Sequence, residues 1–223
     1  MNKLNILYED NHIIVVEKPI NVLSQSDNTN DLDLLTMVKN YIKEKYNKPG
    51  NVYVGLVHRL DRVVGGIMVF AKTSKAASRL SDQIRLNNVN KTYLAIVHGK
   101  TKNNNILKDK LLKLSDFNTI VDNKGKDSEL SYELIEYLEK DNLSLVKVNL
   151  KTGRHHQIRV QFSSRGYPLV GDKRYGKDNI NEIGLYAYKL SFIHPTTKEK
   201  MEFKLIPKHS LFSKFNLKNI DKN

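Results

Sequence analysis

The chain has 223 residues, which is enough for one large domain or two small ones with a buried core. Its 37 Lys and Arg residues against 24 Asp and Glu residues give a net charge of +13, so the sequence indicates a polyanionic partner (RNA, DNA or an anionic membrane surface) or else only a solvated, lysine-rich surface. The absence of Cys excludes disulfides, thiolate metal sites and Cys nucleophiles, and without an apolar signal segment or a run of ~20 apolar residues we expect a cytoplasmic protein with no membrane partner.

The first half of the chain alternates short apolar runs with segments of helical spacing. Residues 12–17 contain a β-branched run, Ile13-Ile14-Val15-Val16, and predict a strand. Residues 34–46 predict a helix that ends at Pro49-Gly50. Further strands are expected over residues 52–57 and 67–71. Thr73 or Ser74 can cap the helix that follows.

The second half is richer in strands. The pattern predicts a strand at 93–97, a polar variable excursion at 101–128, and a hairpin from 130–138 and 143–150. A helical stretch then opens at Thr152-Gly153. A last hairpin from 185–193 and 200–205 follows, and residues 208–223 are expected to be a loose tail. Because strict alternation of strands and helices is missing, the predicted class is α+β: a mixed, mainly antiparallel sheet flanked by helices and loops, as a single domain over residues 1–223.

One polar cluster stands at the end of a predicted strand and contains a single carboxylate. In His58-Arg59-Leu60-Asp61-Arg62, one His and two Arg residues surround Asp61. Nearby cations favour the ionised form of Asp61, which suits a nucleophile or an electrostatic stabiliser. The alternative is a salt bridge that pins the turn.

A second cluster, residues 151–159, joins a glycine before a helix start to Arg154, His156, Gln157 and Arg159. These groups suit phosphate oxygens. A metal site is the competing interpretation, but adjacent His residues on a helix point about 100° apart and do not easily share an ion. We therefore expect no metal, with an exposed basic helix start as the remaining alternative.

Tyr93 forms a third candidate, in Lys91-Thr92-Tyr93 on a predicted strand. A tyrosine there most often serves packing, and it gains chemical meaning only if it faces Asp61. Phosphate-loop, dinucleotide-binding, serine-esterase and zinc motifs are absent from the sequence, which argues against those chemistries.

Taken together, the clusters resemble the RluA family of RNA pseudouridine synthases, the large-subunit ribosomal RNA type, from about residue 6 to 207. The resemblance rests on five motifs in the right order: His58-Arg59-Leu60-Asp61-Arg62 with Gly66; Lys91-x-Tyr93-x-Ala95-x-Val97-x-Gly99; Thr152-Gly153-Arg154-x-His156-Gln157-Ile158-Arg159; Gly166-x-Pro168-x-x-Gly171-Asp172 with Tyr175-Gly176; and Leu190-x-Phe192-x-His194-Pro195.

The resemblance implies the pseudouridine synthase fold with an RNA-binding catalytic cleft, and isomerisation of uridine in ribosomal or transfer RNA without a cofactor. It implies that the target base is flipped into a pocket, with Arg59 filling the vacated space. Asp61 would attack or assist at the sugar, Arg159 would pair with Asp61, and the Tyr93 hydroxyl would be a proton acceptor. His58, Arg62, Arg154, His156 and Gln157 would complete the RNA-binding set.

The chain departs from the family pattern at two places, Val63-Val64 in the turn after Asp61 and Tyr186 where a His is common. It also begins almost directly with the catalytic domain, so RNA docking is expected to rest on that domain, acting as a monomer and without DNA as a substrate. A non-catalytic RNA-binding protein would explain the charge but not the carboxylate among arginines. An anionic-membrane binder would need an amphipathic basic helix, and the apolar stripe of residues 34–46 is explained by core packing.

Overall fold

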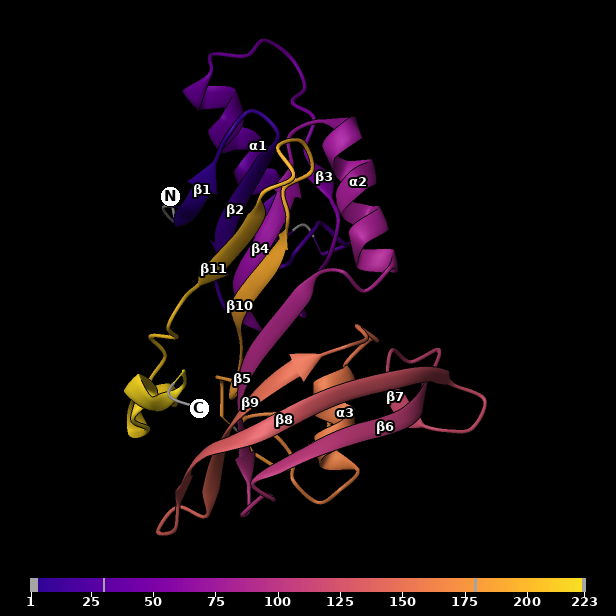
Figure 1. Ribbon diagram of the computed structural model, residues 1–223, viewed down its shortest axis with the longest axis vertical. Coiled ribbons are helices and arrows are strands. Elements are labelled where there is room, and N and C mark those ends of the chain that lie inside the picture. The colour runs from indigo at the N-terminus through magenta and orange to yellow at the C-terminus, as the bar shows by residue number, and fades with distance from the viewer. Residues whose placement is uncertain (1–3, 30, 179, 222–223) are drawn as a thin grey trace. The chain divides into compact units, whose positions relative to one another are not determined.

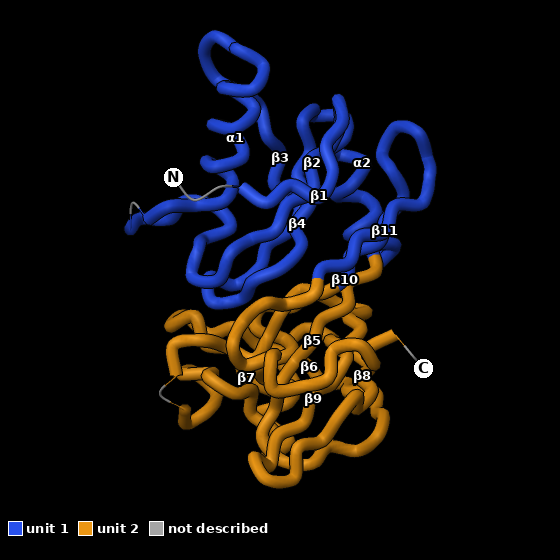
Figure 2. The backbone as a smooth tube through the Cα atoms, turned by 90° about the vertical axis from the view of Figure 1, so that its left-hand side faces the viewer, with its two compact units in different colours: residues 1–89, 189–205 blue, residues 90–188, 206–223 orange. Residues whose placement is uncertain are grey.

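The computed structural model describes residues 4–29, 31–178 and 180–221. The chain forms two compact units that interleave in sequence (Figure 2). Unit 1 comprises residues 1–89 and 189–205, and unit 2 comprises residues 90–188 and 206–223. The expectation of a single domain stays a prediction.

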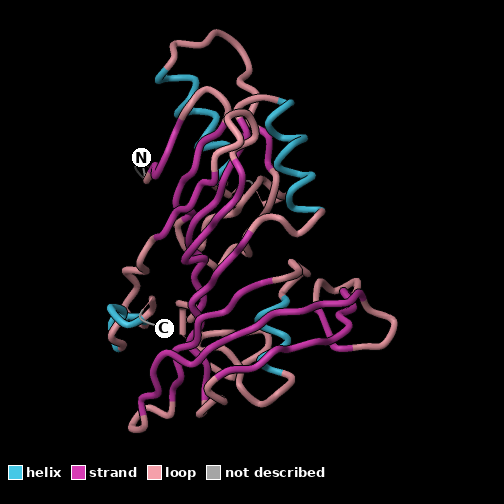
Figure 3. The backbone as a smooth tube through the Cα atoms, viewed as in Figure 1, coloured by secondary structure: helices cyan, strands magenta, loops and turns pink. Residues whose placement is uncertain are grey.

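Unit 1 contains strands of a mainly antiparallel sheet and two helices (Figures 1 and 3). Its elements are β1 (Ile6–Glu9), β2 (Ile13–Lys18), α1 (Leu34–Lys45), β3 (Gly55–Leu56), β4 (Gly65–Ala71), α2 (Ser74–Arg85), the end of β10 (Leu185–Ile193) and β11 (Lys200–Lys204). The strand order is β1-β2-β4-β10, with β11 on β10 and β3 on β4. Both helices begin at side-chain caps: Asp33 accepts from the Thr36 N–H and Thr73 from the Ala76 N–H.

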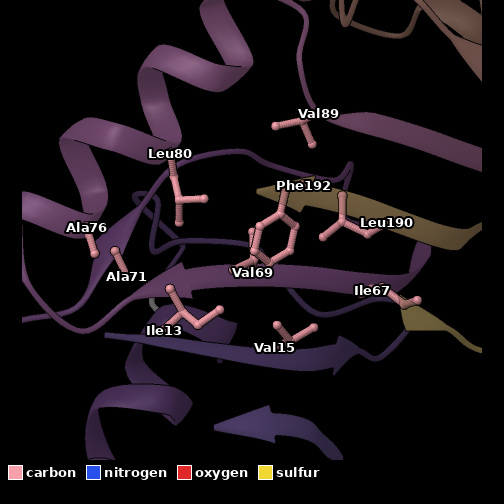
Figure 4. Packing of buried hydrophobic residues seen from close by; sticks show 10 residues of the cluster. All are labelled: Ile13, Val15, Ile67, Val69, Ala71, Ala76, Leu80, Val89, Leu190 and Phe192. Carbon is pink, nitrogen blue, oxygen red and sulfur yellow. The ribbon is translucent and has the colours of Figure 1, made fainter. Parts of the chain in front are cut away.

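The core of unit 1 lies between the sheet and α2. Every residue of β4 is buried, and the apolar side chains of β2 are as well. Figure 4 shows Leu80 and Ala76 of α2 above Val69 and Ala71 of β4, with Phe192 of β10 beside them. Because β2 and β4 are covered on both faces, they consist of continuous apolar runs instead of alternating ones.

Unit 2 is a second antiparallel array, with strand order β5-β9-β8-β6-β7. Its elements are β5 (Asn90–His98), β6 (Asn104–Lys113), β7 (Thr119–Val121), β8 (Lys126–Leu138), β9 (Leu143–Leu150), α3 (Gln157–Ser163), the start of β10, and the single turns η1 (Phe212–Lys214) and η2 (Leu217–Asn219). Phe162 of α3 packs on Tyr132 of β8 with the ring centroids 5.1 Å apart.

The predicted fold class is confirmed. The sheet is mainly antiparallel: β2 pairs in this sense with β1 and β4, β9 with β5 and β8, and β6 with β7 and β8. The short ladders of β3 with β4 and of β10 with β11 are also antiparallel, and an isolated parallel bridge joins Leu23 to Asp33. The hairpin of β8 and β9 and that of β10 and β11 lie where the patterns indicated. Among the described residues, no helix is long and apolar enough to cross a membrane.

Three sequence expectations need correction. The strand predicted over residues 52–57 is only the two-residue β3, so most of that segment is an extended loop. The stretch opened at Thr152-Gly153 becomes helical only at Gln157, because His156 has left-handed backbone angles with φ of 52°. The polar segment 101–128 is not a plain excursion, since it forms β6, β7 and the start of β8.

The C-terminal segment packs on its own unit. Phe212 is fully buried, Ile220 nearly so, and Ile220 accepts a hydrogen bond at its carbonyl from Lys147. The ring of Tyr186, the residue that departs from the family pattern, lies edge-on to His209 and Phe212, with centroids 5.1 and 6.4 Å away. Tyr186 therefore helps to bury the segment that sequence analysis expected to be loose.

Candidate active site

Asp61 lies in the loop between β3 and β4, just after the buried Leu60. Its carbonyl accepts a hydrogen bond from the Val64 N–H at 3.0 Å, which closes a tight turn before β4. The Ser24 hydroxyl donates to the Leu60 carbonyl at 2.7 Å and accepts from the Leu60 N–H at 3.1 Å. Both main-chain groups of the residue before Asp61 are therefore fixed by one buried side chain.

The buried Lys18, at the end of β2, holds the same loop from the other side. Its Nζ donates to the carbonyls of Pro19, Val22 and Arg62 at 2.9, 2.5 and 3.0 Å. Burial lowers the pKa of Lys18 to about 7, against the opposing attraction of the Asp61 carboxylate. No role was predicted for Lys18 from the sequence. A buried lysine has no sequence signal that separates it from a surface lysine.

The three basic residues next to Asp61 in sequence lie in one loop but in different settings. Val69 donates its N–H to His58 Nε2 at 3.1 Å, so the proton of a neutral His58 ring is on Nδ1. Arg59 is exposed. Arg62 is also exposed and pairs with Asp31 at 2.7 Å. Arg59 and Arg62 are thus available at the surface of unit 1, whereas His58 serves the loop.

The second cluster, in unit 2, is organised by Gln157. Its side-chain oxygen accepts from the Thr152 hydroxyl and from the Arg154 N–H at 2.8 and 3.0 Å, and its Nε2 donates to the Glu129 carbonyl at 3.1 Å. Gln157 is only 3% exposed. We predicted it as an RNA-binding residue, and its contacts are with the protein, where they shape the loop before α3. Arg154 is exposed and donates through Nε to the Asp127 carbonyl.

His155 and His156 do not diverge as residues of a helix would. They precede α3, and their rings stack with centroids 3.7 Å apart. His155 Nδ1 contacts the Thr119 hydroxyl at 2.8 Å, and His156 Nδ1 contacts the Tyr175 hydroxyl at 2.7 Å. The geometric argument against a shared ion therefore fails here, but no three His, Asp or Glu residues of the described chain are grouped to hold a metal.

Arg159 is buried on α3 beside a buried carboxylate. Its Nε and Nη2 donate to the two oxygens of Asp172, each at 2.8 Å. Burial by itself would raise the pKa of Asp172, but the guanidinium and two backbone N–H groups outweigh it and hold that pKa below its ordinary value. Tyr93, the third predicted catalytic residue, is on β5 and 8% exposed. Asp172 and Tyr175 belong to a quoted motif but received no role.

The predicted residues thus form two local groups. Unit 1 brings His58, Arg59, Asp61 and Arg62 into one loop supported by Lys18 and Ser24, and unit 2 brings Arg154, His156, Gln157 and Arg159 around the start of α3 with Asp172 and Tyr175. Each of the two groups presents an exposed arginine, Arg59 and Arg62 in unit 1 and Arg154 in unit 2, and arginine suits an anionic substrate.

Known proteins similar to this chain share one activity in their names. Residues 12–164 match the RNA pseudouridylate synthase family. The chain is 35% identical over 217 residues to an uncharacterized RNA pseudouridine synthase of Aquifex aeolicus, covering 91% of this chain and 69% of that protein. It is 33% identical to ribosomal large subunit pseudouridine synthase C of Buchnera aphidicola, covering 88% and 65%. The chain thus spans about two thirds of these relatives.

Solved structures agree in fold. Human RNA pseudouridylate synthase domain containing 4 has a TM-score of 0.76 at 19% identity and covers 92% of this chain and 89% of its own. The human domain containing 1 protein has a TM-score of 0.73 at 24% identity, covering 92% and 84%. The chain therefore belongs to the RNA pseudouridylate synthase family, the enzymes that isomerise uridine in RNA to pseudouridine.

Proposed function

We propose that Asp61 is the catalytic carboxylate of this synthase, that Tyr93 and Arg159 act with it, and that the substrate is ribosomal RNA. The observation that carries the assignment is the Asp61 turn. A single carboxylate follows a buried leucine, and Ser24 and Lys18 fix the main chain on both sides of it. A carboxylate needed only for a surface salt bridge would not require such support.

The overall reaction conserves atoms and electrons. The N1–C1′ bond of uridine breaks, the uracil turns, and a C5–C1′ bond forms. C5 then loses its proton, and N1 gains one. Asp61 acts at the sugar, either as a nucleophile that is later displaced or by assisting loss of the base. Arg159 keeps the carboxylate ionised, and the Tyr93 hydroxyl is a proton acceptor near C2′ of the sugar.

RNA binding is proposed to use base flipping and phosphate contacts. The target base leaves the stack, and Arg59, which is exposed, takes its place through its planar guanidinium. Arg62 and Arg154 are exposed as well and meet phosphate oxygens. The names of several relatives specify the ribosomal large subunit, which favours ribosomal over transfer RNA.

The test of the proposed function is Asp61→Asn. Asparagine keeps the shape but has no charge and is a poor nucleophile, so pseudouridine formation should cease while melting temperature and RNA affinity stay close to wild type. If Asp61 only anchors an arginine, the variant should instead lose a few kcal/mol of stability and keep its activity per folded molecule. Both transcripts, large-subunit ribosomal RNA and transfer RNA, are assayed on the same preparation. Modification of transfer RNA alone would overturn the proposed substrate.

A further inference from the structure

We propose that Asp172 and Tyr175 are positioning residues that fix the direction of the Arg159 guanidinium for the isomerisation. This inference rests on the proposed role of Arg159. It assigns function to a turn, residues 171–176, whose residues do not include any of the predicted catalytic or RNA-binding groups.

The pairing of Arg159 with Asp172 is side-on. Nε donates to Oδ2 and Nη2 to Oδ1, each at 2.8 Å, so Asp172 holds the guanidinium along its Nε–Nη2 edge. A two-point contact of this kind fixes the plane of a guanidinium as well as its position. The Arg159 side chain is 8% exposed and that of Asp172 is 0% exposed, so water does not screen the pair. The far edge of the guanidinium is thus held in one direction.

Asp172 is itself fixed on its own turn. Its Oδ1 also accepts from the N–H groups of Arg174 and Tyr175, at 3.0 and 3.1 Å, and its carbonyl accepts from the Gly176 N–H at 2.8 Å. The preceding Gly171 has φ of +74°, and a Cβ there would stand 1.7 Å from the Glu182 carbonyl oxygen. Only glycine fits at that point, so the carboxylate cannot easily shift with respect to its surroundings in unit 2.

Tyr175 limits movement of the guanidinium out of the ion-pair plane. The Arg159 Cζ lies 5.1 Å from the centroid of the Tyr175 ring, which is the range of a cation–π contact. The Tyr175 hydroxyl contacts His156 Nδ1 at 2.7 Å and accepts from the Thr119 N–H at 2.9 Å. The ring is therefore tied to the residue before α3 and to β7, and it closes one side of the Arg159 site.

The same unit contains a natural comparison. Arg165, just beyond the end of α3, makes a two-point contact with Asp109 on β6, at 2.9 and 3.1 Å. Its side chain is 32% exposed and Asp109 is 11% exposed. The two pairs have the same chemistry and link α3 or its end to a neighbouring segment. They differ in that neither Arg165 nor Asp109 has a proposed role in catalysis.

The experiment compares Asp172→Asn with Asp109→Asn on the ribosomal RNA transcript that the wild-type protein modifies. In Asp172→Asn an amide N–H faces the guanidinium N–H groups, so Arg159 must turn. A misdirected group typically costs about 10²-fold in rate. We expect kcat to fall by about that factor with KM within about threefold of wild type. Asp109→Asn should keep kcat within about threefold even if its melting temperature falls equally. A normal kcat in folded Asp172→Asn overturns the proposal.

A double-mutant cycle separates positioning from general support. If Asp172 acts through Arg159, then Arg159→Ala and Arg159→Ala with Asp172→Asn should have equal kcat within about twofold. A further loss in the double variant means that Asp172 acts independently of Arg159 and overturns the proposal. If Asp172→Asn does not fold, Tyr175→Leu carries the test, because it leaves the ion pair intact. It should lower kcat about tenfold at unchanged KM, and an unchanged kcat overturns the proposal.

Failure of this inference is distinguishable from failure of the proposed function. An active Asp61→Asn variant refutes the catalytic assignment itself. Inactive Asp61→Asn and Arg159→Ala together with a fully active Asp172→Asn leave that assignment intact and refute only the positioning role.

Discussion

The loop that carries Asp61 and the helix that carries Arg159 are held by different kinds of interaction. In unit 1 the supporting side chains, Lys18 and Ser24, bind main-chain carbonyl and N–H groups of the loop. In unit 2 the support acts on the functional side chain itself, through the carboxylate of Asp172. The first arrangement fixes the course of the backbone, and the second fixes the direction of a side chain.

This difference predicts different consequences of mutation. Loss of a backbone support leaves buried carbonyls without donors, which costs stability and disorders the loop. Loss of a side-chain partner on a helix leaves the backbone in place, because the helix retains its own hydrogen bonds. Variants of the backbone supports Lys18 and Ser24 in unit 1 should therefore affect stability first and rate second, and variants of the side-chain support Asp172 in unit 2 should do the reverse.

After the loss of activity expected for Asp61→Asn, the largest effect is on rate and arises in unit 2. Tyr93→Phe keeps the aromatic ring on β5 and removes only the hydroxyl, so RNA affinity and folding should change little. Loss of a proton acceptor typically lowers the rate by ~10²–10⁴. Single-turnover assays measure the chemical step apart from binding. A near-normal single-turnover rate would return Tyr93 to the packing role that is commonest for a strand tyrosine.

The next largest effect is on stability and arises in unit 1. Lys18→Met should lower the free energy of unfolding by about 3 kcal/mol, because three carbonyls lose their donor. The pKa of Lys18 is about 7 in the folded protein, well below that of an exposed lysine. Between those values the unfolded chain binds more protons, so the contribution of Lys18 to stability rises as pH increases from about 7 to about 10.5.

Urea unfolding of wild type and Lys18→Met at pH 7 and pH 9.5 tests whether the contribution of Lys18 to stability rises with pH. The stability difference between wild type and Lys18→Met should be larger at pH 9.5, and Lys140→Met, at an exposed turn, should match wild type within about 0.5 kcal/mol at both. A difference that shrinks at pH 9.5 would show that the ammonium form, not the neutral amine, is the stabilising species.

The sequence predicted the sheet, the hairpins and the Asp61 loop better than it predicted their supports. Periodicity and capping residues are local signals, and Thr73 caps α2 as expected. Asp172 is 13 residues from Arg159 in sequence. It lies on a turn that passes close to the Glu182 carbonyl, which only Gly171 permits, so no local pattern relates Asp172 to Arg159. α3 starts late because the backbone of His156 is left-handed, a conformation that residues other than glycine rarely adopt.

A smaller effect tests whether side-chain support also exists in unit 1. The Glu9 carboxylate, 7% exposed, accepts from Lys45, Lys72, Tyr41 and Tyr46. Burial alone would raise its pKa, but these hydrogen bonds outweigh burial and lower it to about 2. Its contribution, about 2–3 kcal/mol, is therefore complete above about pH 4.5 and is lost as pH falls toward about 2.

Glu9→Gln isolates that contribution. The variant should be less stable than wild type by that amount at pH 7, and the difference should shrink progressively in unfolding experiments between pH 5 and pH 2.5. Activity at pH 7 should be unchanged while the protein is folded, since Glu9 has no proposed contact with RNA. A stability difference that is independent of pH would assign the effect to packing instead of charge.

The smallest expected effect concerns RNA affinity and the exposed arginines of the Asp61 loop. With a net charge of +13, binding should release counterions, so affinity should fall at least about tenfold between 50 and 200 mM salt. If Arg59 takes the place of the flipped base and also meets a phosphate, Arg59→Gln should reduce the slope of log affinity against log salt by about 1. Lys140→Gln removes one charge from the exposed turn between β8 and β9 and should leave the slope unchanged. Titration of the same transcript at four salt concentrations measures all three proteins. Equal reductions in both variants would mean that the slope reports total charge, and Arg59 would lose its specific place at the RNA.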